Sequence, residues 1–286
     1  MDERGVHLTR AIMESPEHYL TRAERDVVLR SARALVQPFL GGKCDVVDLA
    51  PGDALKTRVL LERFRDRDVR YVPISSSDAM LTEVRRAGAR SLPWLPIFPV
   101  RAEAYAVIAH LSALDPSRKR FVLWLGSEIG QLDRGAALTY LRLLRDALRP
   151  GDRLLVSFDL VKDPALLEAT YDDAEGLQAQ LHFNLLARIN RELGGQFFAS
   201  DFRYRAEYSP AKQAVSCQLV SRRAQSVRVG HFRHELSALD CIQTELACKY
   251  RQSEIHDFAR RAGFVERGSD TDERSLVQVA CWSVSA

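Results

Sequence analysis

In residues 43–160, short runs of apolar residues alternate with segments in which apolar residues recur at a helical period. Short apolar runs predict buried strands at 45–49, 69–74, 95–100, 120–125 and 153–158. Between these runs the apolar positions recur with a helical period, which predicts helices at 55–66, 78–88, 102–113 and 134–149. Strands that alternate with helices predict an α/β fold with a parallel sheet and right-handed crossovers.

The flanking segments have different patterns. Residues 1–42 and 163–193 show a helical period. After residue 197 apolar residues alternate with charged ones, which predicts antiparallel strands in a separate lobe over 197–250. A helix at 253–262 and a strand at 276–284 are expected near the C-terminus.

One stretch places a ligand site on the predicted sheet. The apolar run from Asp45 to Leu49 ends in Ala50-Pro51-Gly52, and a helical pattern follows. Strand, tight turn and helix form the first unit of a nucleotide-binding sheet, in which ligands lie at the carboxyl ends of the strands. By itself the stretch is equally typical of a plain βα turn in any α/β domain.

Composition and charge narrow the class of protein. The 286 residues are 46% hydrophobic and 28% charged with a net charge of +3, which is typical of a globular protein without a nucleic-acid partner. No uncharged run approaches the ~18 residues of a membrane span, and the charged N-terminus does not resemble a signal peptide. The five scattered cysteines form no C-x-x-C motif, so we expect a cytoplasmic protein without a metal site. The pattern predicts no particular oligomeric state.

Five short segments, spread over nearly the whole chain, carry the motifs of one known family. Residues 16–22 read P-E-H-Y-L-T-R, similar to P-E-Y-Y-P-T-R, and residues 48–57 read D-L-A-P-G-D-A-L-K-T, similar to E-L-G-S-G-x-S-x-K-T. Residues 125–131 and 159–163 are similar to G-S-T-I-G-N and D-L-V-K-D. Residues 243–250 are similar to T-E-I-S-x-K-F. The chain thus resembles the histidine Nα-methyltransferases of ergothioneine biosynthesis, which use S-adenosylmethionine (SAM).

The resemblance implies a fold and an activity. It implies a Rossmann-type class I methyltransferase sheet with an added α+β lobe that closes over the substrate. The expected divisions are an N-terminal helical segment that joins the substrate lobe, a SAM-binding domain, the substrate-closing lobe, and a C-terminal helix and strand, over residues 1–42, 43–195, 196–252 and 253–286. The implied activity is SAM-dependent N-methylation of a free amino acid, histidine or a related one.

The same resemblance implies site residues. Tyr19 and Tyr171 are the expected catalytic residues, which act by positioning the substrate. The expected amino-acid-binding residues are Tyr19, Gly126, Gln131, Tyr171, Glu245 and Ala247. The expected SAM-binding residues are Ala50, Gly52, Lys56, Ser75, Arg101, Ala102 and Ser127.

Departures from the family motifs leave an alternative open. Ser75 stands where the family has an acid that binds the ribose hydroxyls. A neutral serine gives up the charge-assisted part of these hydrogen bonds, which costs roughly 1–3 kcal/mol of binding free energy. Asp78 could replace the acid in part. Arg101-Ala102-Glu103 replaces a Gly-Asp-Phe motif at the adenine. The alternative is a degenerate methyltransferase fold that binds an amino-acid-like ligand or a partner protein without methyl transfer. Glu245 could likewise be a helix-surface acid paired with Lys249.

Overall fold

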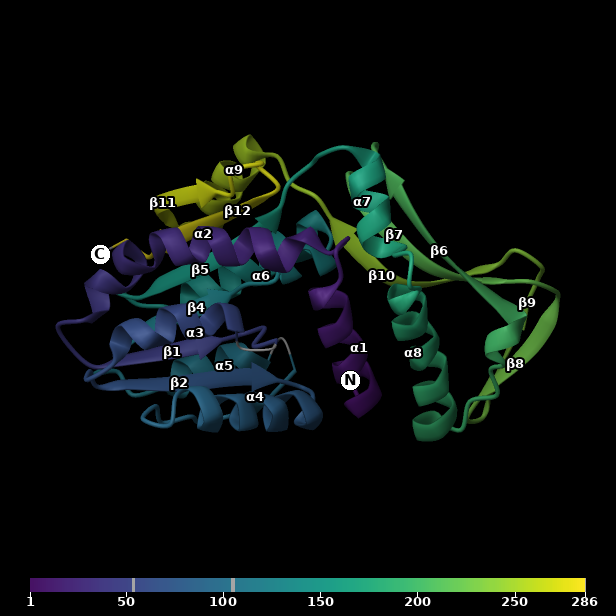
Figure 1. Ribbon diagram of the computed structural model, residues 1–286, viewed down its shortest axis with the longest axis horizontal. Helices are drawn as coiled ribbons and strands as arrows, with labels where there is room; N and C mark the ends of the chain where they lie inside the picture. The colour runs from purple at the N-terminus through teal and green to yellow at the C-terminus, as the bar shows by residue number, and fades with distance from the viewer. Residues whose placement is uncertain (53–54, 104–105, 286) are drawn as a thin grey trace. The chain divides into compact units, whose positions relative to one another are not determined.

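The computed structural model describes residues 1–52, 55–103 and 106–285. These residues form two compact units, whose helices and strands are labelled in Figure 1. Unit 1 comprises Met1 with residues 19–161 and 249–286, and unit 2 comprises residues 2–18 and 162–248. The chain therefore leaves unit 1 and returns to it more than once. Among the described residues, no helix combines the length and the apolar character that a membrane span needs.

Unit 1 is built on a seven-stranded sheet of order β11-β12-β5-β4-β1-β2-β3. Five strands are parallel, and β12 and β11 are antiparallel to their neighbours at one edge. The strands are β1 (Cys44–Asp48), β2 (Val69–Ser75), β3 (Val100–Arg101), β4 (Lys119–Trp124), β5 (Arg153–Asp159), β11 (Val265–Thr271) and β12 (Val277–Ser283). Because β1 lies between β2 and β4 and is parallel to both, the prediction of a parallel sheet built around residues 45–49 is confirmed.

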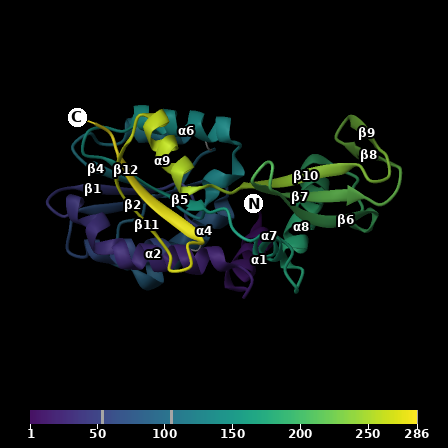
Figure 2. The ribbon, with the colours of Figure 1, turned by 90° about the horizontal axis from the view of Figure 1, so that it is seen from above.

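Helices cover both faces of this sheet. Figure 2 shows α6 and α9 on one side and α2 on the other. The helices of unit 1 are α2 (Tyr19–Val36), α3 (Leu55–Leu61), α4 (Asp78–Ser91), α5 (Ala106–Ala113), α6 (Arg134–Ala147) and α9 (Gln252–Ala262). Side-chain caps set two of the starts, because Ser77 accepts a hydrogen bond from the Met80 N–H and Asp133 accepts one from the Ala136 N–H. The central strands are consequently buried on both sides, and the fold is a three-layer α/β sandwich.

The predicted strand at 95–100 is wrong for most of its length. Only Val100–Arg101 pairs as β3, and the preceding residues form turns with an isolated bridge between Tyr71 and Ile97. Prolines at 93, 96 and 99 lack the N–H that a strand must donate, so a continuous ladder cannot form there. The helix expected from residue 102 begins at Ala106 as α5.

Unit 2 packs helices against a small antiparallel sheet. Its sheet has the order β10-β7-β6, with a separate hairpin of β8 and β9. Its elements are α1 (Glu3–Glu14), α7 (Pro164–Tyr171), α8 (Leu177–Leu193), β6 (Phe202–Ser209), β7 (Ala214–Ser221), β8 (Gln225–Val229), β9 (Phe232–Leu236) and β10 (Cys241–Cys248). Leu186 of α8 packs on Phe202 and Leu219 of the sheet.

The two units cut across the expected functional divisions. Helices α7 and α8, expected with the SAM-binding domain, lie in unit 2, as does α1. Asp2 connects α1 to α8, since its carboxylate accepts hydrogen bonds from Asn184 and Arg191 at 2.8 and 2.7 Å. Those hydrogen bonds hold the pKa of Asp2 well below its usual range, against the opposing effect of burial. The assignment of functions to residues 1–42, 43–195, 196–252 and 253–286 stays a prediction.

Candidate functional site

A cavity of about 310 Å³ opens at the carboxyl ends of β1, β2 and β4 in unit 1. The chain segments that follow these strands, together with α5 and α6, supply its walls. The lining residues are Leu49, Ile74, Ser75, Ser76, Ala102, Glu103, Val107, Trp124, Glu128, Gln131, Leu132 and Tyr140. This is the edge of the sheet at which the sequence predicts a ligand.

The turn after β1 is fixed by a buried carboxylate. Asp48 is fully buried and accepts hydrogen bonds from Thr57 Oγ1 at 2.7 Å, Tyr71 Oη at 2.9 Å and the Ala50 N–H at 3.1 Å. Gly52 has a φ of 46°, in the left-handed region that favours glycine. The turn beside the cavity therefore has a defined conformation that a side chain at position 52 would strain.

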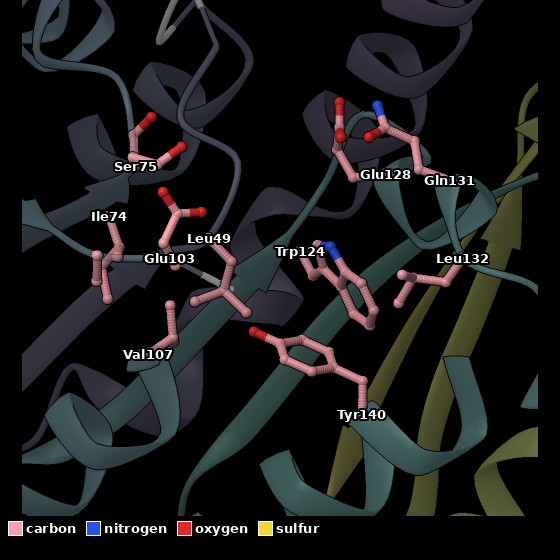
Figure 3. Close-up of a pocket in the computed structure, with 12 residues that line it drawn as sticks. Leu49, Ile74, Ser75, Glu103, Val107, Trp124, Glu128, Gln131, Leu132 and Tyr140 are labelled. Atoms are coloured by element: carbon pink, nitrogen blue, oxygen red, sulfur yellow. The ribbon is translucent and has the colours of Figure 1, made fainter. Parts of the chain in front are cut away.

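Two carboxylates give the cavity its charge. Figure 3 shows the Glu103 carboxylate beside the Ser75 side chain, and Glu128 next to Gln131. The described side chains that line the cavity include no lysine or arginine. An environment of this sign favours ligands that carry positive charge or several hydroxyl donors. Neither glutamate is a predicted site residue, although Glu103 lies in the segment 101–103 and Glu128 in the motif at 125–131.

Aromatic side chains form the apolar part of the cavity. Trp124 and Tyr140 pack edge to face with their ring centroids 5.0 Å apart, and both are nearly buried. Leu49, Ile74 and Val107 extend this apolar surface. A cavity with apolar walls and a few polar groups is typical of a site for a nucleoside or a similar small molecule.

The predicted SAM-binding residues are distributed unevenly around this cavity. Ser75 and Ala102 line it. Ala50 and Gly52 form the turn after β1. Arg101 forms an ion pair with Asp78 at 2.9 Å on the surface. Asp78, the possible replacement for the ribose acid, is therefore bound to Arg101. The Ser127 N–H donates to Ser157 Oγ at 2.9 Å. Lys56 lies in α3, and its side chain is outside the described part of the structure.

The amino-acid-binding residues predicted for unit 1 fall into two groups. Gln131 lines the cavity, at the end of the short 3-10 helix η3 (Glu128–Gln131). Gly126 has a φ of 84°, and its N–H donates to the buried Glu24 carboxylate at 2.5 Å. Tyr19 is buried at the start of α2.

Tyr19 belongs to a buried cluster around one carboxylate. Its hydroxyl donates to the two oxygens of Asp159 at 2.8 and 3.0 Å, and Lys249 Nζ lies 2.7 Å from Asp159 Oδ2. All three residues are at most 5% exposed. The interpretation of Glu245 and Lys249 as a helix-surface pair is wrong, because both lie outside helices and Lys249 is bound to Asp159.

Unit 2 brings the remaining predicted residues close to an unexpected histidine. Tyr171 ends α7, and its carbonyl oxygen accepts a hydrogen bond from Tyr204 Oη at 2.6 Å. The Glu245 carboxylate lies 3.6 Å from Nε2 of His182, whose ring stacks on Tyr204 with centroids 4.9 Å apart. Ala247 follows on β10 and is buried. Burial raises the pKa of Tyr204 well above its usual range, so its hydroxyl stays protonated.

Sequence comparisons identify relatives over the full length of the chain. The sequence model of a family described as histidine-specific, SAM-dependent methyltransferases matches residues 1–284. A histidine N-alpha-methyltransferase of Mycobacterium tuberculosis is 34% identical over 276 residues, which cover 95% of this chain and 84% of the relative. Its counterpart from Mycolicibacterium smegmatis is 34% identical over 259 residues, covering 89% of this chain and 79% of the relative.

A comparison with solved structures agrees on the fold. A presumed methyltransferase from Thermobifida fusca superposes with a TM-score of 0.51 at 16% identity, covering 98% of this chain and 88% of that one. At this identity the likeness concerns the fold alone. It agrees with the seven-stranded, mostly parallel sheet of unit 1.

Proposed function

The chain belongs to the family of histidine-specific, SAM-dependent methyltransferases, and we propose that it methylates the α-amino group of free histidine or a closely related amino acid. The observation that carries the proposal is the acidic, aromatic-walled cavity at the carboxyl ends of β1, β2 and β4. That cavity occupies the position at which an α/β sheet of this order binds a nucleoside cofactor.

The residues of the cavity fit SAM. In this proposal Glu103 accepts hydrogen bonds from the ribose hydroxyls together with Ser75, and so replaces the acid that is missing after β2. Glu128 and Gln131 face the positively charged part of the cofactor, and Trp124 with Tyr140 encloses an apolar portion. In this role Glu103 would compensate for the acid missing at the ribose, which is one of the two departures behind the degenerate, non-catalytic alternative.

The amino acid is assigned to the tyrosines and to Glu245. Tyr171 and Glu245 of unit 2 would hold the carboxylate and the side chain, as the family resemblance implies. In unit 1 the Tyr19 hydroxyl donates its proton to Asp159, so its oxygen retains acceptor capacity for an amino N–H. Gln131 lines the cavity and offers an amide for the amino or carboxylate group.

The chemistry that remains for the chain is positioning. When bound, SAM supplies an electrophilic methyl group on a sulfonium. In unit 1, Tyr19 and Gln131 would hold the amine unprotonated and in line with the methyl carbon, since alignment lowers the barrier without an acid or a base at the reacting atoms. Trp124, Tyr140 and Leu132 would exclude water from that region of the cavity.

The test combines binding and turnover. Purified protein is titrated with SAM by calorimetry, and a panel of free amino acids is then incubated with protein and SAM and analysed by mass spectrometry. We expect SAM to bind and histidine or a near relative to gain the mass of one or more methyl groups. If SAM fails to bind, or binds while no amino acid gains mass, the proposal is wrong and the ligand-binding alternative replaces it.

The setting of the reaction is part of the same proposal. A small-molecule substrate and cofactor, the near-neutral charge and the scattered cysteines together support a cytoplasmic enzyme that needs neither nucleic acid nor a membrane.

A further inference from the structure

Three metal-binding side chains meet inside unit 2. Nε2 of His182, Sγ of Cys217 and the carboxylate of Glu245 all lie within 4.8 Å of one another. They come from α8, β7 and β10. Because the three residues are far apart in the sequence, no motif spacing indicates the cluster. Nitrogen, thiolate sulfur and carboxylate oxygen are the three donor types that Zn²⁺ binds in proteins.

The backbone holds two of the three donors side by side. Glu245 and Cys217 are paired directly across the antiparallel strands β10 and β7, so their side chains project from the same face of the sheet. A register shift between Gln243 and Glu245 adjusts the strand just before the glutamate. Helix α8 packs along β6 of this sheet, and His182 projects from the helix toward Glu245. The cluster is therefore part of the framework of unit 2.

One ring nitrogen of the buried His182 lacks a hydrogen-bond partner among the described residues. The atom is Nε2, and His182 is 5% exposed. The Glu245 oxygen at 3.6 Å is beyond normal hydrogen-bond distance. A buried polar atom without a partner costs about 1–3 kcal/mol, so such an atom in a native fold calls for an explanation. A bound cation would supply one.

We propose that His182, Cys217 and Glu245 form a site for Zn²⁺ or a similar borderline divalent cation. Tetrahedral coordination at bond lengths of about 2.0–2.3 Å places ligand atoms about 3.3–3.6 Å apart, so the histidine and the glutamate already have the right separation. The thiol proton leaves when Cys217 binds the metal. One thiolate, one carboxylate and a neutral imidazole then balance the two charges of the cation.

Burial and exposure also suit a metal. The buried imidazole of His182 can coordinate a metal through Nε2, which has no hydrogen-bond partner among the described residues. The stacked Tyr204 ring fixes the orientation of the imidazole. The Glu245 side chain is 26% exposed, which provides an entry path and leaves the fourth position open to water or to a ligand atom. Three protein ligands with an open position are typical of zinc sites that bind a further ligand.

The test uses the full-length protein, freed of metal with a chelator, without SAM or amino acid. We expect calorimetric titration with Zn²⁺ to give one site per chain. Co²⁺, used as a spectroscopic probe, should give a thiolate-to-metal charge-transfer band in the near ultraviolet. Cys217→Ser should abolish that band, and His182→Gln or Glu245→Gln should weaken Zn²⁺ binding at least about ten-fold.

Matched controls come from the same chain. Cys241→Ser changes an exposed cysteine of unit 2, and His256→Gln changes an exposed histidine that lies 2.8 Å from Glu266. Neither should alter the band or the affinity. Circular dichroism of each metal-free variant checks its fold, and Glu245→Gln, at the most exposed of the three positions, tests the site even if a buried variant does not fold.

Two results would overturn the proposal. One is a wild-type protein that takes up no Zn²⁺, and the other is a charge-transfer band that persists in folded Cys217→Ser. Because the test contains neither SAM nor an amino acid, its failure leaves the proposed methyl transfer untouched. The two proposals share Glu245, so we expect Zn²⁺ and the amino-acid side chain to exclude each other at that carboxylate.

Discussion

At the scale of single residues, the proposed binding of the SAM ribose by Glu103 is open to a direct test. The Glu103 carboxylate beside Ser75 can accept two hydroxyl donors at once, a charge-assisted arrangement that a neutral amide cannot reproduce. We expect Glu103→Gln to weaken SAM binding by roughly ten- to hundred-fold, the equivalent of about 1–3 kcal/mol. Calorimetric titration measures the change. Glu273→Gln, at an exposed position of the same unit, is the control, and equal affinities in both variants would refute the role of Glu103.

His182 makes the stability of the metal-free protein depend on pH. Its pKa is lowered by burial from 6.5 to about 4, so the folded state binds the proton less readily than the unfolded chain. The stabilising contribution is complete above pH 6.5 and is lost as the pH falls toward 4, by about 3 kcal/mol in total.

Urea unfolding in the presence of chelator checks this dependence. Between pH 7.5 and pH 5 the wild type should lose about 2 kcal/mol more unfolding free energy than His182→Gln, since the variant has no imidazole to protonate. Parallel losses in the two proteins would mean that the ring of His182 is not shielded from water as the structure indicates.

At the scale of elements, the turn between β1 and α3 depends on Gly52. Its positive φ costs an L-residue roughly 1–2 kcal/mol. Gly52→Ala should lower the unfolding free energy by about that amount and weaken SAM binding, because the turn borders the cavity. Gly42→Ala is the matched control, since Gly42 has open space around its Cα and no positive φ. Equal thermal stability of the two variants would contradict the prediction.

The sequence predicts elements well where burial is continuous. β1, β2, β4 and β5 are buried over nearly their whole length, because helices cover both faces of the sheet, and each has a short apolar core that the sequence reveals. The sequence does not predict β11, because β11 is a largely exposed edge strand of mixed polar sequence. Whether a strand is central or at an edge depends on its pairing in the folded sheet, and the local pattern of apolar residues does not reveal that pairing.

The same limit applies to the candidate site. The predicted strand ends do supply the walls of the cavity, so its location followed from topology. Trp124 and Tyr140 could not be identified in the same way, because at the end of a strand and on a helix face they look like ordinary core residues. His182 and Cys217 become neighbours of Glu245 only through the packing of α8 on the sheet.

At the scale of the whole molecule, the last segment of the chain completes the first unit. β12 is buried along its whole length and pairs with all seven residues of β5. A chain that ends at residue 248 would expose that edge of β5 and remove α9, which packs on α6. We expect this truncation to abolish cooperative unfolding, as followed by circular dichroism, whereas a chain ending at residue 284 should behave like the full protein. A cooperative transition in the shorter fragment would show that unit 1 folds without its C-terminal strands.

The placement of Trp124 also has a practical use. Of the three tryptophans, it alone lines the cavity, while Trp282 is fully buried and Trp94 lies beneath the guanidinium of Arg65. A cofactor that enters the cavity will change the polarity around one indole and leave the other two as they were. The intrinsic tryptophan fluorescence should therefore report occupancy of the cavity without any label. A Trp124→Phe protein should bind the cofactor with no change in fluorescence.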